Sequence, residues 1–341
     1  MEENMISLKN IRRSFSHSGW ALLIALLIPA LLNLVLGISA DWLMAAFPGL
    51  FENRLFAWAI SFMPVYGIGI PLALLILRSL PADSLEQKKM KTGSLIIAFI
   101  MCFPMMLGGN LIGTFLAQIL TGGRSVNNVV EIISQQDPLI MLTMILAAPT
   151  LEELLFRKFL IDRTARFGEK NAILFSALAF GMFHCNVYQI FYAFGIGLIF
   201  GYIYVRTRNI RYTMLLHFLI NFLSGVVAAY FMGRVDPEMM DLAMNQDTEA
   251  IMKMMTEDPQ MMLSFYASVA PIMIQGLLNV VFAITGLILL CVKRKQFFFL
   301  PQDQEVTGRK GLGAVFMNWG ALCFFLSALA YTAYVLAATC P

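Results

Sequence analysis

Nine hydrophobic stretches dominate this 341-residue chain and restrict what it can fold into. A helix needs about 20 apolar residues to cross the hydrocarbon core of a bilayer. The stretches are roughly 19–38, 55–77, 93–120, 138–157, 171–187, 188–205, 212–232, 262–291 and 312–338. We therefore expect an all-α fold, a polytopic bundle of about nine transmembrane helices. Eight is the alternative count, since 171–187 and 188–205 are close to the minimum length.

The composition agrees with a membrane protein. Hydrophobic residues make up 59% of the chain and charged residues only 13%, against about 25% charged in an average globular protein. The five cysteines are scattered, with no C-x-x-C pair. This spacing argues against a disulfide framework and against a thiolate metal site.

The Lys and Arg residues indicate the orientation, because they concentrate on the cytoplasmic side of membrane proteins. With a cytoplasmic N-terminus and nine crossings, all but four of the 24 Lys and Arg residues lie on that side. The exceptions are Arg54, Arg124, Arg234 and Lys253. A re-entrant loop at 171–187 is disfavoured, since it would move the basic residues at 206–211 to the opposite side.

We divide the chain into four parts. Residues 1–137 hold the first three transmembrane helices, and residues 138–232 hold helices 4 to 7. Residues 233–261 form an acidic, Met-rich extracytoplasmic loop. The methionines of this loop lack the regular spacing of a copper motif, so we expect an amphipathic surface segment. Residues 262–341 hold the last two helices.

Few ionisable residues fall inside the predicted spans. Of the 21 Asp and Glu residues, only Glu152 and Glu153 do so, and they are joined there by Arg157. His184 and His217 lie in the fifth and seventh spans. Ionisable groups inside a membrane are costly and usually face a bundle interior or a water-filled cavity, so they are functional candidates by default.

Helical spacing separates the two glutamates. Glu153 and Arg157 are four residues apart, so they share a helix face and can form an ion pair. Glu152 points about 100° away on the same helix and lacks this local partner. We infer that Glu153 and Arg157 are structural and that Glu152 is available for chemistry.

Two other spans carry polar pairs with the same spacing. Phe180 and His184 share one face of the fifth span, and His217 and Asn221 share one face of the seventh. Facing helices of a bundle can bring such side chains together into one site. We therefore expect Glu152 to meet two imidazoles and one carboxamide.

This set of groups suits the hydrolysis of a peptide bond without a serine or cysteine nucleophile. A carboxylate in a low-dielectric cavity can act as a general base on water, and imidazole or amide donors can stabilise an oxyanion. Zinc is the chemical alternative, with Glu152, His184 and His217 as ligands. However, the chain has no H-E-x-x-H pair, and a zinc protease would need a further base.

Three motifs occur in order within these spans: "EELLFR" fits E-E-x-x-x-R, "FGMFH" fits F-x-x-x-H, and "HFLIN" fits H-x-x-x-N. Together they resemble the CAAX-protease and bacteriocin-processing (CPBP, or Abi) family, the intramembrane proteases that include the Ras-converting type. Each motif alone is a weak signal, but all three in order are specific. The resemblance covers about residues 138–231, and the flanking spans are similar only in being hydrophobic.

The resemblance implies a glutamate-dependent intramembrane endopeptidase. Glu152 would activate water with the help of His184, and His217 and Asn221 would stabilise the oxyanion. The supporting residues would be Glu153, Arg157 and Phe180. No cofactor is expected, although members of the family have also been described as metalloproteases, which keeps zinc as a variant of the mechanism.

Two other classes of function compete with a protease. A membrane scaffold or bacteriocin-immunity protein would keep the motifs and act by binding. A proton-coupled transporter is less favoured, because transporters usually repeat their broken helices in both halves of the chain. We expect the bilayer and a membrane-associated peptide or protein substrate as partners, and no nucleic acid. The expected location is a bacterial cell membrane, with the site opening toward the cytoplasm.

Overall fold

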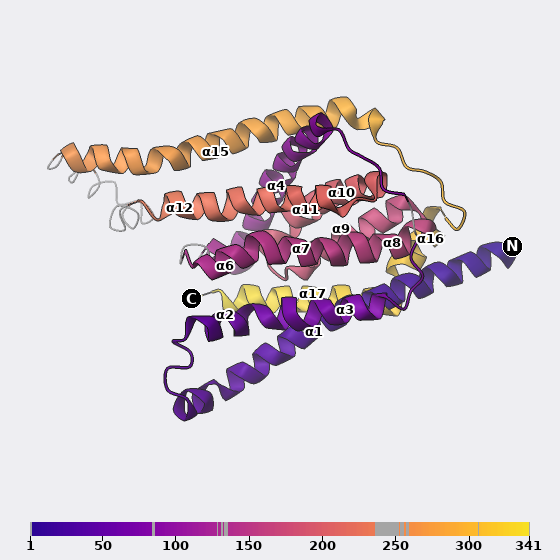
Figure 1. Cartoon of the computed structure of the whole chain (residues 1–341), viewed down its shortest axis with the longest axis horizontal. Coiled ribbons are helices and arrows are strands. Elements are labelled where there is room, and N and C mark those ends of the chain that lie inside the picture. The colour runs from indigo at the N-terminus through magenta and orange to yellow at the C-terminus, as the bar shows by residue number, and fades with distance from the viewer. Residues whose placement is uncertain are drawn as a thin grey trace.

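The computed structural model describes residues 2–83, 86–127, 129–130, 132, 136–235, 252, 256, 259–305 and 307–340. These residues form a bundle of helices (Figure 1) without any strand, which confirms the expected all-α class. The α-helices, some of them continuous with their neighbours, are α1 (Glu2–Ala46), α2 (Arg54–Phe62), α3 (Ile70–Leu77), α4 (Thr92–Thr121), α6 (Pro138–Leu142), α7 (Ala148–Glu153), α8 (Leu160–Thr164), α9 (Glu169–Phe183), α10 (Val187–Thr207), α11 (Ile210–Asn221), α12 (Ala228–Met232), α15 (Pro259–Lys293), α16 (Gly308–Phe316) and α17 (Trp319–Ala338).

Eight continuous helical segments in the described part of the chain are long and apolar enough to cross a membrane. They are Leu8–Ala46, Arg54–Leu77, Thr92–Thr121, Pro138–Phe167, Val187–Thr207, Ile210–Met232, Leu263–Gln296 and Trp319–Ala338. The expected span at 171–187 corresponds to α9, which has only 15 residues. At 1.5 Å per residue α9 is about 22 Å long, shorter than a bilayer core.

Helix α9 forms a hairpin with α10, and Tyr188 at the start of α10 shares a hydrogen bond with Ser125, just beyond the end of α4. The hairpin therefore turns at the end of the bundle opposite the basic segments. The two ends of the chain lie at opposite ends of the bundle (Figure 1).

Two expected segment boundaries are wrong. The first helix is not limited to 19–38, because α1 continues from the basic N-terminal tail to Ala46. The last span does not begin at 312, because the chain breaks between α16 and α17 at Asn318. The side chain of Asn318 caps α17 by accepting a hydrogen bond from the backbone N–H of Ala321. Most of the acidic loop at 233–261 lies outside the described residues.

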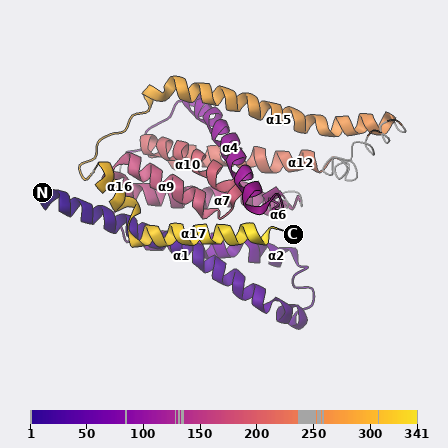
Figure 2. The same ribbon diagram turned by 180° about the vertical axis from the view of Figure 1, so that it is seen from behind.

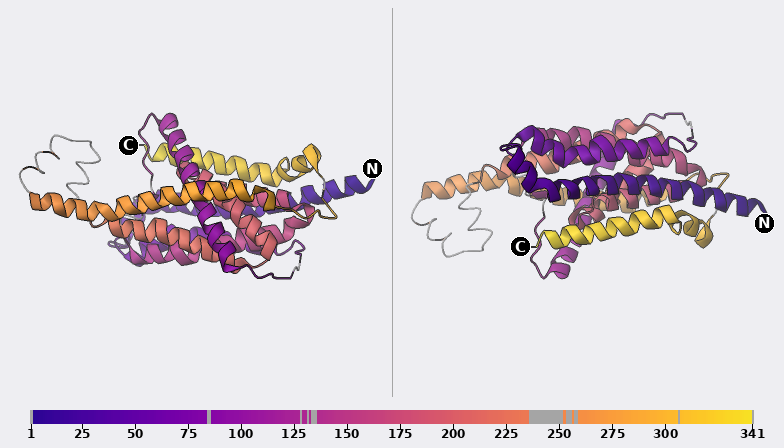
Figure 3. Two further views of the ribbon diagram at one scale, coloured as in Figure 1. Left: turned by 90° about the horizontal axis from the view of Figure 1, so that it is seen from above. Right: turned by 90° about the horizontal axis from the view of Figure 1, so that it is seen from below.

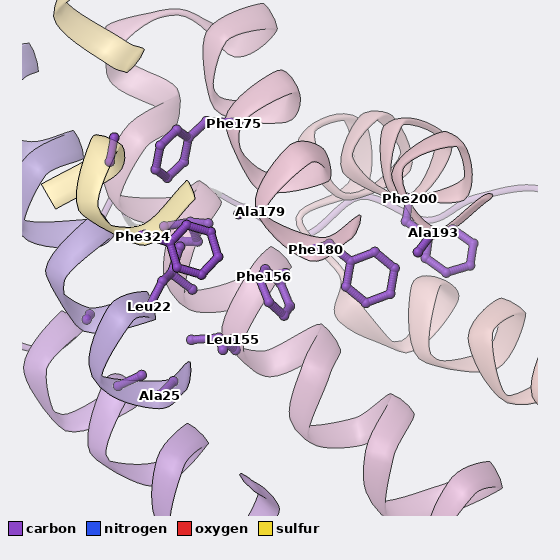
Figure 4. Close-up of a cluster of buried hydrophobic side chains, with 14 of the residues drawn as sticks. Leu22, Ala25, Leu155, Phe156, Phe175, Ala179, Phe180, Ala193, Phe200 and Phe324 are labelled. Atoms are coloured by element: carbon purple, nitrogen blue, oxygen red, sulfur yellow. The ribbon is translucent and has the colours of Figure 1, made fainter. Parts of the chain in front are cut away.

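The hairpin of α9 and α10 lies at the centre of the bundle. Helix α10 packs against α4 and α9, while α15 packs on the far side of α4 and lies at the outer surface in Figure 3. Helix α17 runs beside α1, as the view from behind shows (Figure 2). Between these layers lies one aromatic core, which includes Phe156, Phe175, Phe180, Phe200 and Phe324 (Figure 4).

The contact between α4 and α10 depends on small residues. A Cβ atom added at Gly109 would lie 2.3 Å from the backbone nitrogen of Tyr192, and one at Gly113 would lie 2.5 Å from the carbonyl oxygen of Val187. Backbone atoms at such distances cannot move aside as a flexible side chain can. Close approach at glycines is a common way for membrane helices to associate, and here it fixes the helix that forms one wall of the candidate site.

We expect Gly109→Ala to destabilise the protein by about 1–3 kcal/mol, the usual cost of overpacking. Thermal unfolding in detergent measures this effect. Gly108→Ala is the matched control, because it changes the adjacent residue of the same helix, where an added Cβ meets nothing within 4 Å. Equal stability of the two variants would contradict the importance of this contact.

Candidate active site

Four π-helical segments surround the polar residues in the middle of the bundle. They are η1 (Met63–Gly69), η2 (Thr143–Ala147), η3 (Leu154–Phe159) and η5 (Phe222–Val227). Wider turns of this kind are rare and are often found at functional sites. The short helix α7, which carries both glutamates, lies between η2 and η3. Tyr66 lies within η1, and η5 begins directly after Asn221.

The structure confirms the expected pair of Glu153 and Arg157. Arg157 Nη1 lies 3.3 Å from Glu153 Oε1, and neither side chain is exposed. The guanidinium group of Arg157 also lies over the rings of Phe180 and Phe200, at 4.2 Å and 5.3 Å from their centroids. These faces attract a cation, so Phe180 has a clear supporting role, which is to cover the buried charge of Arg157.

His217 lies between the two glutamates, one at each ring nitrogen. Its Nδ1 is 3.0 Å from Glu153 Oε1, the oxygen that also faces Arg157. Its Nε2 is 3.7 Å from Glu152 Oε2, longer than a hydrogen bond. An ionised carboxylate only accepts hydrogen bonds, so Glu153 holds a hydrogen on Nδ1. In the neutral ring Nε2 then carries a lone pair directed toward Glu152.

Glu152 also has a partner that its own helix does not supply. The hydroxyl group of Tyr66 donates a hydrogen bond of 2.9 Å to Glu152 Oε1. Glu152 therefore lacks a local partner, as its position on the helix predicted, but it is not unpaired. Oε1 binds Tyr66, while Oε2 faces His217.

His184 and Asn221 are each held by a backbone carbonyl group. His184 Nδ1 lies 2.8 Å from the carbonyl oxygen of Phe180, so this nitrogen donates and Nε2 is the one left for chemistry. Asn221 Nδ2 donates to the carbonyl oxygen of Met144 at 2.9 Å, which uses one of its two N–H groups. Both contacts fix the side chains without using all their polar atoms.

A cavity of about 410 Å³ brings these residues together. Glu152, His184, His217 and Asn221 all line it, as does Phe180. Glu153 and Arg157 lie behind the wall, and no Lys or Arg is among the described residues that line the cavity. The remaining polar lining comes from Ser61, Tyr66, Gln189, Tyr192 and Ser224, with apolar residues such as Phe62, Val65, Phe183 and Ile196 between them.

The cavity extends toward the end of the bundle opposite the basic segments. Its lining includes Val129 and Ile132, from the connection that follows α4, and no residue from the basic segments near 78–91, 158–170 or 206–211. An opening toward the basic end, the side that the sequence assigns to the cytoplasm, does not match this lining.

The donor set does not form an evident metal site. Within the described residues, no three His, Cys, Asp or Glu side chains are grouped so that they could hold one metal ion. Glu152 and His217 come close together, but His184 does not complete a set with them. We therefore derive no step through zinc.

The comparisons with known proteins agree with the motifs. A family model described as "Type II CAAX prenyl endopeptidase Rce1-like" matches residues 134–223, which include all seven candidate residues. The chain is also similar to "Putative membrane peptidase YdiL" of Bacillus subtilis (strain 168), with 27% identity over 177 residues. That match covers 50% of this chain and 72% of the relative.

Both similarities support the CPBP family, Rce1 type, over the part of the chain that they cover. The eight apolar helices of the described residues and the similarity to membrane peptidases support a multi-pass membrane protein. No solved structure matches the chain. The arrangement of the motifs described above therefore rests on the structure of this chain, without a solved structure for comparison.

Sequence reasoning missed Tyr66, Gln189 and Tyr192, which also line the cavity. Tyr66 lies two residues after Pro64 in the second span, where a polar aromatic residue close to a helix-breaking proline was the available signal. Gln189 and Tyr192 bind each other across one helical turn at 2.9 Å. None of the three belongs to a motif of the resemblance.

We expect Arg157→Met to destabilise the protein by about 3–5 kcal/mol, because it leaves the buried carboxylate of Glu153 without its cation. Thermal unfolding in detergent measures the loss. Glu153→Gln combined with Arg157→Met removes both charges and should be more stable than Arg157→Met alone.

Lys158→Met is the control for this experiment. Lys158 forms an ion pair with Asp162, but its side chain is 45% exposed. Exposed pairs contribute about 0–1 kcal/mol. If Arg157→Met and Lys158→Met lower the stability equally, the buried pair has no special role.

Proposed function

We propose that this protein is an intramembrane endopeptidase in which Glu152 activates water. One observation carries the proposal: Glu152 and the ring of His217, which Glu153 orients, face each other at the wall of a cavity. A carboxylate that orients an imidazole ring and fixes its tautomer is a recurring device in hydrolases. Here the oriented ring faces a second carboxylate instead of a hydroxyl nucleophile.

The gap between Glu152 and His217 suits a water molecule. Hydrogen bonds of about 2.8 Å from one water oxygen to both groups span the 3.7 Å between Glu152 Oε2 and His217 Nε2. In the proposed reaction, Glu152 Oε2 takes a proton from water, and the hydroxide oxygen attacks the peptide carbonyl carbon. Glu152 then gives this proton to the leaving amine as the C–N bond breaks.

The oxyanion of the intermediate needs hydrogen-bond donors. Asn221 keeps one N–H beyond the one that binds Met144. His217 donates from Nε2 only when its ring carries both protons. We assign the oxyanion to Asn221 and protonated His217. His184 assists at the water through Nε2, since its Nδ1 binds the carbonyl group of Phe180.

The cavity favours internal peptide bonds over a chain end. No Lys or Arg lines it, so a C-terminal carboxylate near Glu152 would be buried without a counter-charge. Apolar residues beside the scissile bond would fit Phe62, Phe183 and Ile196. We propose a membrane-associated peptide or protein as the substrate.

We expect Glu152→Gln, His184→Ala and His217→Ala each to abolish cleavage while the protein still inserts and folds. Mass spectrometry of membrane-associated peptides from wild-type and Glu152→Gln cells identifies the products that disappear. Glu52→Gln, which changes an exposed residue, is the control and should preserve them. Identical peptides and an intact phenotype in Glu152→Gln cells would favour the scaffold or immunity function.

We expect the activity to survive metal removal. A peptide identified by that comparison would be cleaved at an unchanged rate after dialysis against a strong chelator, with metal content measured by mass spectrometry. Loss of cleavage that returns when zinc is added would overturn the metal-independent mechanism and favour the metalloprotease variant.

A further inference from the structure

Helix α2 and segment η1 make three polar contacts with the segment 137–153, which ends in the two glutamates of α7. At the outer end, Arg54 forms an ion pair with Asp137. One turn further in, Trp58 Nε1 donates to Thr143 Oγ1 at 2.8 Å. The last contact is the hydrogen bond from Tyr66 to Glu152, which lies at the cavity.

The backbone and the neighbouring rings hold Tyr66 in place. In an unbroken α-helix, Tyr66 would point about 80° away from the direction of Trp58. The wider turns of η1 rotate the chain less per residue and bring Tyr66 back toward that face. The ring of Phe62 stacks on Trp58 on one side and on Tyr66 on the other, each at 6.3 Å between centroids. The direction of the Tyr66 hydroxyl group is therefore fixed by its own helix.

This contact distinguishes the two oxygens of Glu152. Tyr66 binds Oε1, and Oε2 is left facing His217. Without the hydroxyl group, the carboxylate could rotate and Oε1 would lose its donor. We propose that Tyr66 is a positioning residue that selects Oε2 of Glu152 as the reacting oxygen. This inference rests on the proposed function in that Glu152 is taken as the base.

Groups on every packed element surround Glu152. Tyr66 faces it from η1 and His217 from α11. His184 of α9 and Tyr192 of α10 line the same cavity. On its own chain segment, Glu153 is adjacent, and Arg157 lies one turn away. Among the described residues, Tyr66 is the only donor of a hydrogen bond to the Glu152 carboxylate. Removing its hydroxyl group therefore changes one interaction and leaves the others in place.

The test is Tyr66→Phe, which keeps the ring stack on Phe62 and removes only the hydroxyl group. We expect kcat/KM to fall about tenfold to a hundredfold, mostly in kcat, as when a hydrogen bond to a charged group is lost. The substrate is the peptide found by comparing wild-type and Glu152→Gln cells.

A second measurement does not need a substrate. Infrared difference spectra between wild type and Glu152→Gln isolate the carboxylate stretching bands of Glu152. The same difference between Tyr66→Phe and Tyr66→Phe/Glu152→Gln should show these bands shifted, since Oε1 has lost its hydrogen bond. Shifted bands without any cleaved peptide would uphold the positioning role and overturn the proposed function.

Tyr204→Phe is the matched control. Tyr204 also donates to a buried carboxylate, Asp162, at 2.8 Å, but it lies outside the cavity. We expect the infrared bands of Glu152 and the value of kcat/KM to be unchanged in this variant. If Tyr66→Phe matches wild type in both measurements, or if Tyr204→Phe shifts them equally, the positioning role of Tyr66 is overturned.

Discussion

The candidate site is built around one buried cation. Arg157 carries its charge into the centre of the bundle without exposure to solvent, where an unpaired charge would be strongly disfavoured. Glu153 balances the charge, and the rings of Phe180 and Phe200 cover it. Because Glu153 is then ionised and accepts from His217, the tautomer of His217 follows from the same pair. The direction of the lone pair that faces Glu152 thus depends on Arg157, which does not line the cavity.

The parts of the site that follow from local spacing could be predicted from the sequence. Glu153 and Arg157 pair across one turn of a helix, and the segments that cross the membrane could be recognised from their apolar length. Contacts between distant segments could not be predicted in this way. Tyr66 meets Glu152 across 86 residues, and His217 meets Glu153 across 64. Such contacts depend on how each helix is rotated about its axis.

The π-helical segments explain much of why these contacts between distant segments could not be predicted. A prediction from 3.6-residue periodicity assumes a constant rotation per residue, but η1, η2, η3 and η5 change it on three of the membrane-spanning segments. The break at Asn318 and the shortness of α9 could not be predicted either. A helix cap and the buried end of a hairpin do not alter the mean hydropathy, so hydropathy does not locate them. The direction in which the cavity extends depends on all of these elements together.

The polar residues of α7 also bear on how the chain is assembled during synthesis. Charged residues in the middle of a segment raise the cost of its entry into the lipid by about 2.5–3.5 kcal/mol each on insertion scales. Tyr66 is made before Glu152, so this partner is already in the membrane when α7 arrives. His217 is made 64 residues after Glu153. The two glutamates therefore gain their long-range partners at different times, and the complete site forms only once α11 has been inserted.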